Sequence, residues 1–241
     1  REGYKPVRSE WVVNSGGRIQ LPVLGDWRDN SDGDALSVTA AKDSGSDGVV
    51  NVTAGGDVRF KAPIEAGIHT VTYAVTDSSG SDAEGSLRFR VLKPDDVATF
   101  VAPIPQPDVA RGEVGKPIVI SPLGNDMPGV DALAPNAELK LMRNVTGMPA
   151  QVDTGSGLIT VRSSQPRTFW LQYGVKFGQE TAQSKIRVDI SQPRKATTPI
   201  TMPDSVRLKG AAATTVDVLA NDLDPAGGLL TVQGVRPTYA Q

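Results

Sequence analysis

Residues 69–75 read His-Thr-Val-Thr-Tyr-Ala-Val, and residues 169–175 read Phe-Trp-Leu-Gln-Tyr-Gly-Val. An offset of 100 residues superposes Tyr73 on Tyr173 and matches the aliphatic residues two positions before and after each tyrosine. Within each stretch the tyrosine and these aliphatic residues fall on every second position, which is typical of a β-strand with one buried face. The recurrence of one strand indicates that the chain contains two copies of one unit.

A second pattern has nearly the same period and adds a third copy. A leucine followed by a small residue and then by Asp or Asn-Asp occurs at Leu24, Leu123 and Leu219, which are 99 and 96 residues apart. Two unrelated patterns with one period predict tandem repeats. Proline-rich stretches separate the units and are expected to act as semi-rigid linkers. The predicted units are residues 1–93, residues 94–193, and residues 194–241 as the opening part of a third repeat.

Short alternating runs fill the rest of both complete units, and clusters of Gly, Asp, Ser and Asn separate them. No segment shows sustained helical spacing. Several short strands with frequent turns in about 100 residues predict an all-β fold, with tandem immunoglobulin-like β-sandwiches in a linear array. The third unit is too short to close a sandwich, so we expect it to lean on a neighbouring domain, another chain or further sequence. The runs are residues 36–38, 50–52, 58–60, 71–75, 87–91, 139–141, 159–161, 186–190 and 230–232.

Composition excludes several classes of function. The 25 Lys and Arg residues nearly balance 27 Asp and Glu residues, for a net charge of -2, so binding of nucleic acid through a basic surplus is not expected. Cysteine is absent and His69 is the single histidine, which excludes a disulfide framework, a thiolate nucleophile and a Cys/His zinc site. No catalytic motif pairs a nucleophile with His69, so no enzyme activity is predicted. No apolar run reaches the roughly 20 residues that span a bilayer.

An acidic loop follows the first leucine motif and has two interpretations. Calcium takes about six to eight hard oxygen ligands, and Gly33 would let the loop fold around an ion, although the spacing is not that of an EF-hand. The other interpretation is a solvated loop, because surface loops of β-sandwiches are often acidic. Asp77 and Asp82 could add ligands only if their loop lies at the same end of the domain. The candidate calcium ligands are Asp26, Asp29, Asn30, Asp32 and Asp34.

Aromatic residues also have a structural and a functional interpretation. Tyr73 and Tyr173 are in phase with buried neighbours, so we expect packed rings with hydroxyl groups bonded to the backbone. His69 lies at the start of the same strand and is expected to be structural or exposed. Trp27 and Trp170 are expected to be partly exposed, and they either stack on a sugar or pack against a linker or a neighbouring domain.

The residues around the third leucine motif resemble a known family. Residues 218–232 read Val-Leu-Ala-Asn-Asp-Leu-Asp-Pro-Ala-Gly-Gly-Leu-Leu-Thr-Val, which is similar to the pattern VLxNDxDPDGDxLxV of bacterial Ig-like, cadherin-like tandem repeats. Residues 56–60 with Pro63 resemble the hairpin DGxVxYxP of the family, and residues 71–80 resemble its strand FTYTVxDxxG. The second unit lacks the acidic run of the pattern, so a metal role does not carry over to it.

This resemblance implies repeated modules in a long extracellular chain, as in adhesins and giant actinobacterial envelope proteins. Because the chain starts with Arg1 rather than Met, we interpret it as part of a longer protein. The predicted function is a non-enzymatic stalk segment of a large bacterial cell-surface protein, located outside the cell or in its envelope, whose partners are neighbouring Ig-like repeats. The alternative is an adhesin or glycan-binding module that contacts a glycan or protein ligand directly. Neither interpretation includes nucleic acid or a membrane span, and calcium is the one candidate cofactor.

Overall fold

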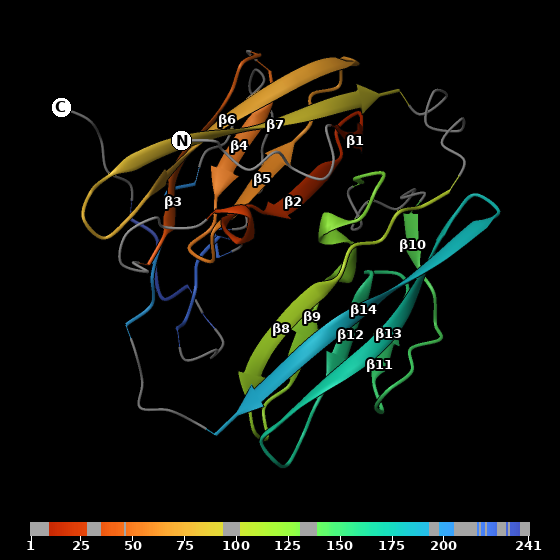
Figure 1. Cartoon of the computed structure of the whole chain (residues 1–241). Helices are drawn as coiled ribbons and strands as arrows, with labels where there is room; N and C mark the ends of the chain where they lie inside the picture. The colour runs from red at the N-terminus through yellow and green to blue at the C-terminus, as the bar shows by residue number, and fades with distance from the viewer. Residues whose placement is uncertain are drawn as a thin grey trace.

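A computed structural model describes most of the two complete repeats and parts of the third. The described residues form β-strands and two short 3-10 helices, and the two repeats appear as separate sandwiches in Figure 1. Each sandwich has one four-stranded and one three-stranded sheet. The prediction of an all-β fold with tandem immunoglobulin-like sandwiches is therefore confirmed. The described residues are 10–27, 35–45, 47–93, 102–130, 139–192, 198–204, 216, 218–219, 221–225, 230 and 232–236.

In the first domain the larger sheet has the order β1-β7-β6-β3 and the smaller sheet the order β2-β5-β4. Strand β1 runs parallel to β7, and the other pairs are antiparallel. The elements are β1 (Trp11–Asn14), β2 (Arg18–Pro22), η1 (Leu24–Asp26), β3 (Ser37–Asp43), β4 (Val49–Val52), β5 (Asp57–Lys61), β6 (Gly67–Thr76) and β7 (Asp82–Leu92).

The second domain repeats this plan, with sheet orders β10-β13-β14-β8 and β11-β12-β9. Its first strand again runs parallel to its last, since β8 pairs with β14. The two leucine motifs lie in η1 and η2, and Tyr73 and Tyr173 lie on β6 and β13, which confirms the period found in the sequence. The elements are β8 (Asp108–Glu113), β9 (Ile118–Ile120), η2 (Pro122–Asn125), β10 (Leu139–Leu141), β11 (Gln151–Asp153), β12 (Leu158–Val161), β13 (Arg167–Phe177) and β14 (Glu180–Ser191).

Each domain has its own hydrophobic core, built mainly from aliphatic residues at alternate strand positions. In the first core Phe60 and Phe89 stack with their ring centroids 4.4 Å apart. In the second core Leu171 and Ile186 face each other across β13 and β14 and are fully buried. Burying such a side chain stabilises the fold by roughly 1.5–3 kcal/mol, so each domain holds its shape by packing.

The described part of the third repeat has the same hydrogen bonds as the segment that precedes β8 in the second repeat. Ile200 and Leu223 exchange two backbone hydrogen bonds of 2.8 and 2.9 Å, and the Met202 N–H donates to the carboxylate of Asp222 over 2.8 Å. The same bonds join the residues 96 positions earlier, and the second domain therefore predicts the geometry of the third. Those equivalent residues are Ile104, Met127, Gln106 and Asp126.

This opening segment packs against the first domain, as the blue trace beside the orange strands shows in Figure 1. The Ala54 N–H donates to the carbonyl of Asn221 over 3.0 Å, and Met202 packs against the core of the first domain. The expectation that the third unit leans on a neighbour is confirmed. The expected strand at residues 230–232 is wrong for its described members, since Leu230 and Val232 are not in a strand. A strand needs a paired neighbour for its backbone groups, and no strand pairing is found at the two residues.

Candidate functional site

A short segment of the second domain packs into the first and joins the two. The side chain of Met127 is 2% exposed and belongs to the hydrophobic core of the first domain, although its backbone belongs to the second. Gly129, two residues later, continues the contact. Its N–H donates to the Val12 carbonyl over 2.9 Å, and its carbonyl accepts from the Asn14 N–H over 2.8 Å. Residues 127–129 thus extend the edge of the first domain.

Two glycines allow this close approach. A Cβ atom on Gly129 would lie 3.0 Å from the Arg18 carbonyl oxygen and 3.1 Å from Ile19 Cβ, both in the first domain. A Cβ atom on Gly17 would lie 2.6 Å from the carbonyl oxygen of Gly129. Contacts under 3.0 Å do not occur between real Cβ atoms and backbone oxygens, so any side chain at Gly17 would push the domains apart.

The segment before β8, which contains Ile104 and Gln106, contacts residues 126–127 of the second domain. Ile104 and Met127 exchange backbone hydrogen bonds of 2.9 and 3.1 Å, and Ile104 also packs against the core of the first domain. The Gln106 N–H donates to Asp126 Oδ1 over 2.7 Å. The linker between the sandwiches is therefore hydrogen-bonded to the segment that it precedes.

A buried group of polar side chains lies directly beside this junction. Asp126 is fully buried, and the hydroxyl oxygen of Tyr173 lies 3.1 and 3.2 Å from its two carboxylate oxygens and 3.0 Å from the Gln106 carbonyl. The single hydroxyl proton is shared among these acceptors. Asp108 adds a second carboxyl group, whose Oδ2 atom is buried without a hydrogen-bond partner among the described residues. Asn125 completes the group and donates to the Pro107 carbonyl over 3.4 Å.

Burial makes both carboxyl groups weaker acids than a carboxyl group in water. Burial, followed by repulsion from Asp126, raises the pKa of Asp108 to about 8. Burial also raises the pKa of Asp126 to about 7, against the hydrogen bonds from the Gln106 N–H and the Tyr173 hydroxyl. The pKa of Tyr173 is raised by burial and then by the two carboxylates. Near neutral pH the pair retains at least one proton, because two adjacent buried negative charges are costly.

In the first domain the equivalent tyrosine, Tyr73, has an indole ring as its described side-chain partner. There the Trp27 indole N–H donates to the Tyr73 hydroxyl over 3.1 Å, and the two rings meet edge to face. The expectation of packed tyrosine rings is confirmed, because Tyr73 is 6% exposed and Tyr173 is fully buried. The expected backbone bond of the hydroxyl is found for Tyr173, whereas Tyr73 receives its hydrogen bond from a side chain.

His69 is structural, as expected. Its Nδ1 atom lies 2.9 Å from Asp43 Oδ2, and its ring packs against Phe60 with the centroids 5.6 Å apart. Asp43 also accepts hydrogen bonds from the backbone N–H groups of Gly45 and Gly48. The pair therefore fastens the loop after β3 to strand β6.

The candidate calcium loop falls almost wholly outside the described residues. Asp26 ends η1, while Asp29, Asn30, Asp32 and Asp34 are not described. In the described part of the chain no three acidic or histidine side chains gather as metal ligands. The two acidic residues considered as further ligands have local partners. Asp77 accepts hydrogen bonds from Ser79 and Ser81 in its own turn, and Asp82 accepts one from Thr76.

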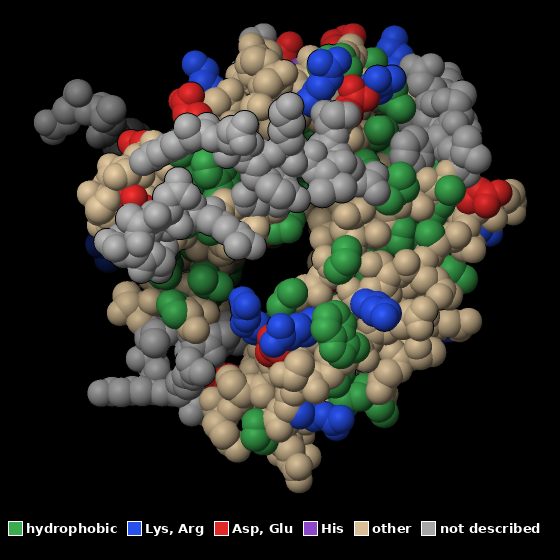
Figure 2. Space-filling view, viewed as in Figure 1, with side chains coloured by type: hydrophobic (Ala, Val, Ile, Leu, Met, Phe, Trp, Pro, Cys, Tyr) green, Lys and Arg blue, Asp and Glu red, His purple; other side chains and the backbone are tan. Residues whose placement is uncertain are grey.

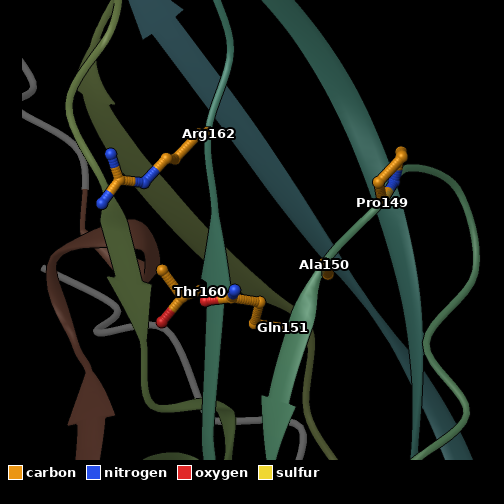
Figure 3. Close-up of a pocket in the computed structure, with 5 residues that line it drawn as sticks. All are labelled: Pro149, Ala150, Gln151, Thr160 and Arg162. Atoms are coloured by element: carbon orange, nitrogen blue, oxygen red, sulfur yellow. The ribbon is translucent and has the colours of Figure 1, made fainter.

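A hollow of about 430 Å³ lies on the three-stranded sheet of the second domain (Figure 3). Among the described residues its lining holds one charged side chain, Arg162, and one hydroxyl group, that of Thr160. Arg162 points away from the apolar part of the hollow in Figure 3. The other lining residues are Pro149, Ala150, Gln151 and Thr160.

The sequence held a signal for the buried carboxyl pair that its interpretation missed. Pro107-Asp108 and Asn125-Asp126 recur 96 residues later as Pro203-Asp204 and Asn221-Asp222. A Pro-Asp and an Asn-Asp pair with a constant separation of 18 residues indicate side chains that meet in space. The burial of Met127 in another domain left no comparable signal.

The first domain matches a known family. Residues 5–90 match the model of the family described as bacterial Ig domain, which confirms the resemblance for this part of the chain. No curated protein matches the chain. None of the helices in the described residues is long and apolar enough to cross a membrane.

Solved structures with tandem domains are similar to the chain at low sequence identity and low TM-score. The four N-terminal Ig domains of Dscam1 isoform 6.9 are 10% identical, with a TM-score of 0.41 over 81% of this chain and 56% of theirs. A second Dscam structure, on isoform specificity, is 11% identical, with a TM-score of 0.38 over 77% of this chain and 51% of its own. Drosophila N-cadherin EC1-4 is 14% identical, with a TM-score of 0.29 over 77% of this chain and 49% of its own. The chain spans about half the length of these structures.

Proposed function

We propose that this chain is a structural segment of a bacterial cell-surface protein that holds neighbouring modules at a fixed spacing and orientation. The observation that carries the proposal is the burial of Met127, a residue of the second domain, in the core of the first. Domains that share only a tether are expected to move relative to one another. Here the second domain cannot leave the first without exposing Met127 and breaking the two hydrogen bonds between Gly129 and strand β1.

The strength of the junction supports a mechanical role. Burial of a methionine side chain contributes roughly 1.5–3 kcal/mol, and each backbone hydrogen bond adds about 0.5–1.5 kcal/mol. The junction thus restricts the angle between the sandwiches without a large interface. A stalk built from such joints transmits position along its length.

Further parts of the proposal extend this role. The domain boundaries are residues 1–93, 94–193 and 194–241, the repeats continue as a linear array in a longer chain, and the chain acts outside the cell or in its envelope. The partners are the neighbouring Ig-like repeats, and no catalytic step is assigned to this segment. An actinobacterial source and calcium binding at the acidic loop stay predictions.

Substitution of Gly129 by Val tests the junction in solution. The three atoms nearest to an added Cβ atom all belong to the first domain, so we expect both sandwiches to fold while the joint opens. Gly124→Val is the matched control, because a Cβ atom at Gly124 meets nothing within 4 Å. Small-angle X-ray scattering should show one compact arrangement for the unmodified chain and the control, and a larger maximum dimension with a broader distribution for Gly129→Val. A flexible profile for the unmodified chain would refute the proposal, as would an unchanged profile for Gly129→Val.

A second candidate function is direct contact with a surface ligand, and one specific observation favours it. Trp170 is 54% exposed on β13, out of phase with its buried neighbours as the sequence predicted, while Trp27 is half-buried against Tyr73. An exposed indole ring in the middle of a sheet is available to a ligand.

A further inference from the structure

The outer face of the four-stranded sheet in the second domain is basic, although the chain as a whole has a net charge of -2. On these strands the outward side chains alternate with buried ones, and five of them are cations against one carboxylate, Asp189, among the described residues. The exposed and half-buried outward side chains that the structure describes on these strands therefore carry a net charge of +4; Glu113, in the outward row of β8, is buried and bonded to Lys116. Figure 2 shows Lys and Arg side chains beside hydrophobic ones over this part of the molecule. The cations are Lys140, Lys176, Lys185, Arg187 and Arg111.

The strand register places the exposed tryptophan among these charges. Arg187 on β14 lies between Trp170 on β13 and Val109 on β8, which is 58% exposed. Lys185 lies one step along β14, opposite Gln172, and Lys140 pairs with Lys176 further along the sheet.

The single carboxylate of the face is already neutralised. Arg187 Nε lies 3.0 Å from Asp189 Oδ1. The hydrogen bond from Thr168, followed by the hydrogen bond and charge of Arg187 and the charge of Arg111, holds the pKa of Asp189 below its usual value. The two arginines therefore have an acidic partner within the sheet. No comparable carboxylate faces the three lysines in the outward rows of these strands.

The dimensions of the face fit an extended chain. Neighbouring strands are about 4.8 Å apart, and alternate residues along a strand are about 6.8 Å apart. The row from Trp170 to Lys176 is thus roughly 20 Å long. A polymer lying along β13 and β14 would first meet the indole ring of Trp170. It would next pass Lys185 and the amide pair Gln172 and Gln183, and it would reach Lys176 and Lys140 last.

We propose that this face binds an acidic polysaccharide, with a sugar ring stacked on Trp170 and the acidic groups of the chain paired with Lys185, Lys176 and Lys140. The inference rests on the second candidate function and leaves the role of the domain junction untouched. Aromatic rings with a polar rim suit ligands that are apolar on one face and hydroxylated at the edge, and a patch of one charge sign draws in an oppositely charged chain. A protein partner fits less well, because protein interfaces have an apolar centre and this face offers only Trp170 and Val109.

Binding by the whole chain should be measured by titration calorimetry in a buffer of about 50 mM salt. The probes are heparin as a sulfated polysaccharide, polygalacturonate as a carboxylated one and dextran as a neutral one. Polyglutamate and single-stranded DNA are the controls, because they are polyanions but not polysaccharides. We expect binding of heparin or polygalacturonate or both, weakening as salt rises, and none of dextran. If polyglutamate or DNA binds as tightly as the polysaccharides, or if neither acidic polysaccharide binds, the proposal is overturned.

Charge reversal and ring removal locate the site. Lys176→Glu with Lys185→Glu should lower the affinity at least about tenfold, while Lys42→Glu with Lys61→Glu, which makes the same charge change on exposed strand residues of the first domain, should leave it within about twofold. Equal losses of affinity in the two double variants would mean non-specific electrostatic attraction and would overturn the proposal.

Two substitutions of Trp170 separate stacking from charge. Trp170→Tyr keeps an aromatic face and should retain most of the affinity, whereas Trp170→Gln should lose about fivefold or more. Because Trp170 is outward, both variants are expected to fold, and thermal unfolding checks this. Unchanged affinity in Trp170→Gln overturns the assignment to a polysaccharide. X-ray scattering of the same samples reports on the junction separately, so failure of this proposal and failure of the spacer proposal give different results.

Discussion

Substitution of Asp126 by Asn tests the buried carboxyl pair through the pH dependence of stability. Asparagine keeps the shape of the side chain, and its Oδ1 atom can still accept from the Gln106 N–H and the Tyr173 hydroxyl. The change removes one ionisable group from a pair with no cation among its described partners, which are Tyr173, Asn125 and the Gln106 N–H. The geometry therefore stays while the electrostatic cost of ionisation disappears.

The magnitude follows from the shifted pKa. Burial raises the pKa of Asp126 from 3.8 to about 7, and each pKa unit corresponds to about 1.4 kcal/mol. Because the folded state binds the proton more tightly than the unfolded state, the contribution to stability is fully present below about pH 4 and is lost as the pH rises to about 7. Ionisation of Asp126 thus costs at most about 4 kcal/mol of the free energy of unfolding. Asp108, with a pKa of about 8, extends the loss to higher pH.

Urea unfolding at about pH 5, 6.5 and 8, followed by circular dichroism, measures the effect. The unmodified second domain should lose stability across this range, and the Asp126→Asn variant should lose distinctly less, because one charge is gone and the pKa of Asp108 falls with it. Glu180→Gln, at the exposed turn between β13 and β14, is the control for removal of a carboxyl group and should follow the unmodified chain. A variant with the same pH dependence as the unmodified chain would refute the reasoning, as would an unmodified chain that gains stability toward pH 8.

The other predictions concern the junction, the histidine pair and the acidic loop. Met127→Ala should lower the free energy of unfolding of the first domain by about 2–5 kcal/mol, although the residue belongs to the second; a change seen only in the second domain contradicts the shared core. His69→Ala leaves Asp43 buried without its side-chain partner and should cost about 1–3 kcal/mol in urea unfolding, with His69→Gln recovering part of the loss. If calcium binds the loop that starts at Asp26, millimolar calcium should raise the melting temperature relative to a chelator, and an unchanged value contradicts the calcium interpretation.

The sequence by itself determined the strands, the sandwich class and the repeat. Alternation of apolar residues is a local property, because successive side chains of a strand point to opposite faces whatever the strand packs against. The runs around Tyr73 and Tyr173 therefore predicted two buried strand faces, and their separation predicted two domains. The same local rule placed Trp170 on an outward position. The strand prediction was wrong for Leu230 and Val232, because alternation does not supply a pairing partner.

Only the tertiary structure decided how the domains join and what surrounds the buried acids. Asp108 and Asp126 are 18 residues apart, and their pKa values depend on burial by elements that the local pattern does not describe. The side chain of Met127 completes the core of a different domain, a contact that depends on how two finished surfaces fit. Similarly, the basic face around Trp170 arises because sheet register brings together charges from four strands. Local periodicity decides which side of a strand is buried, whereas non-local packing decides which residues meet there.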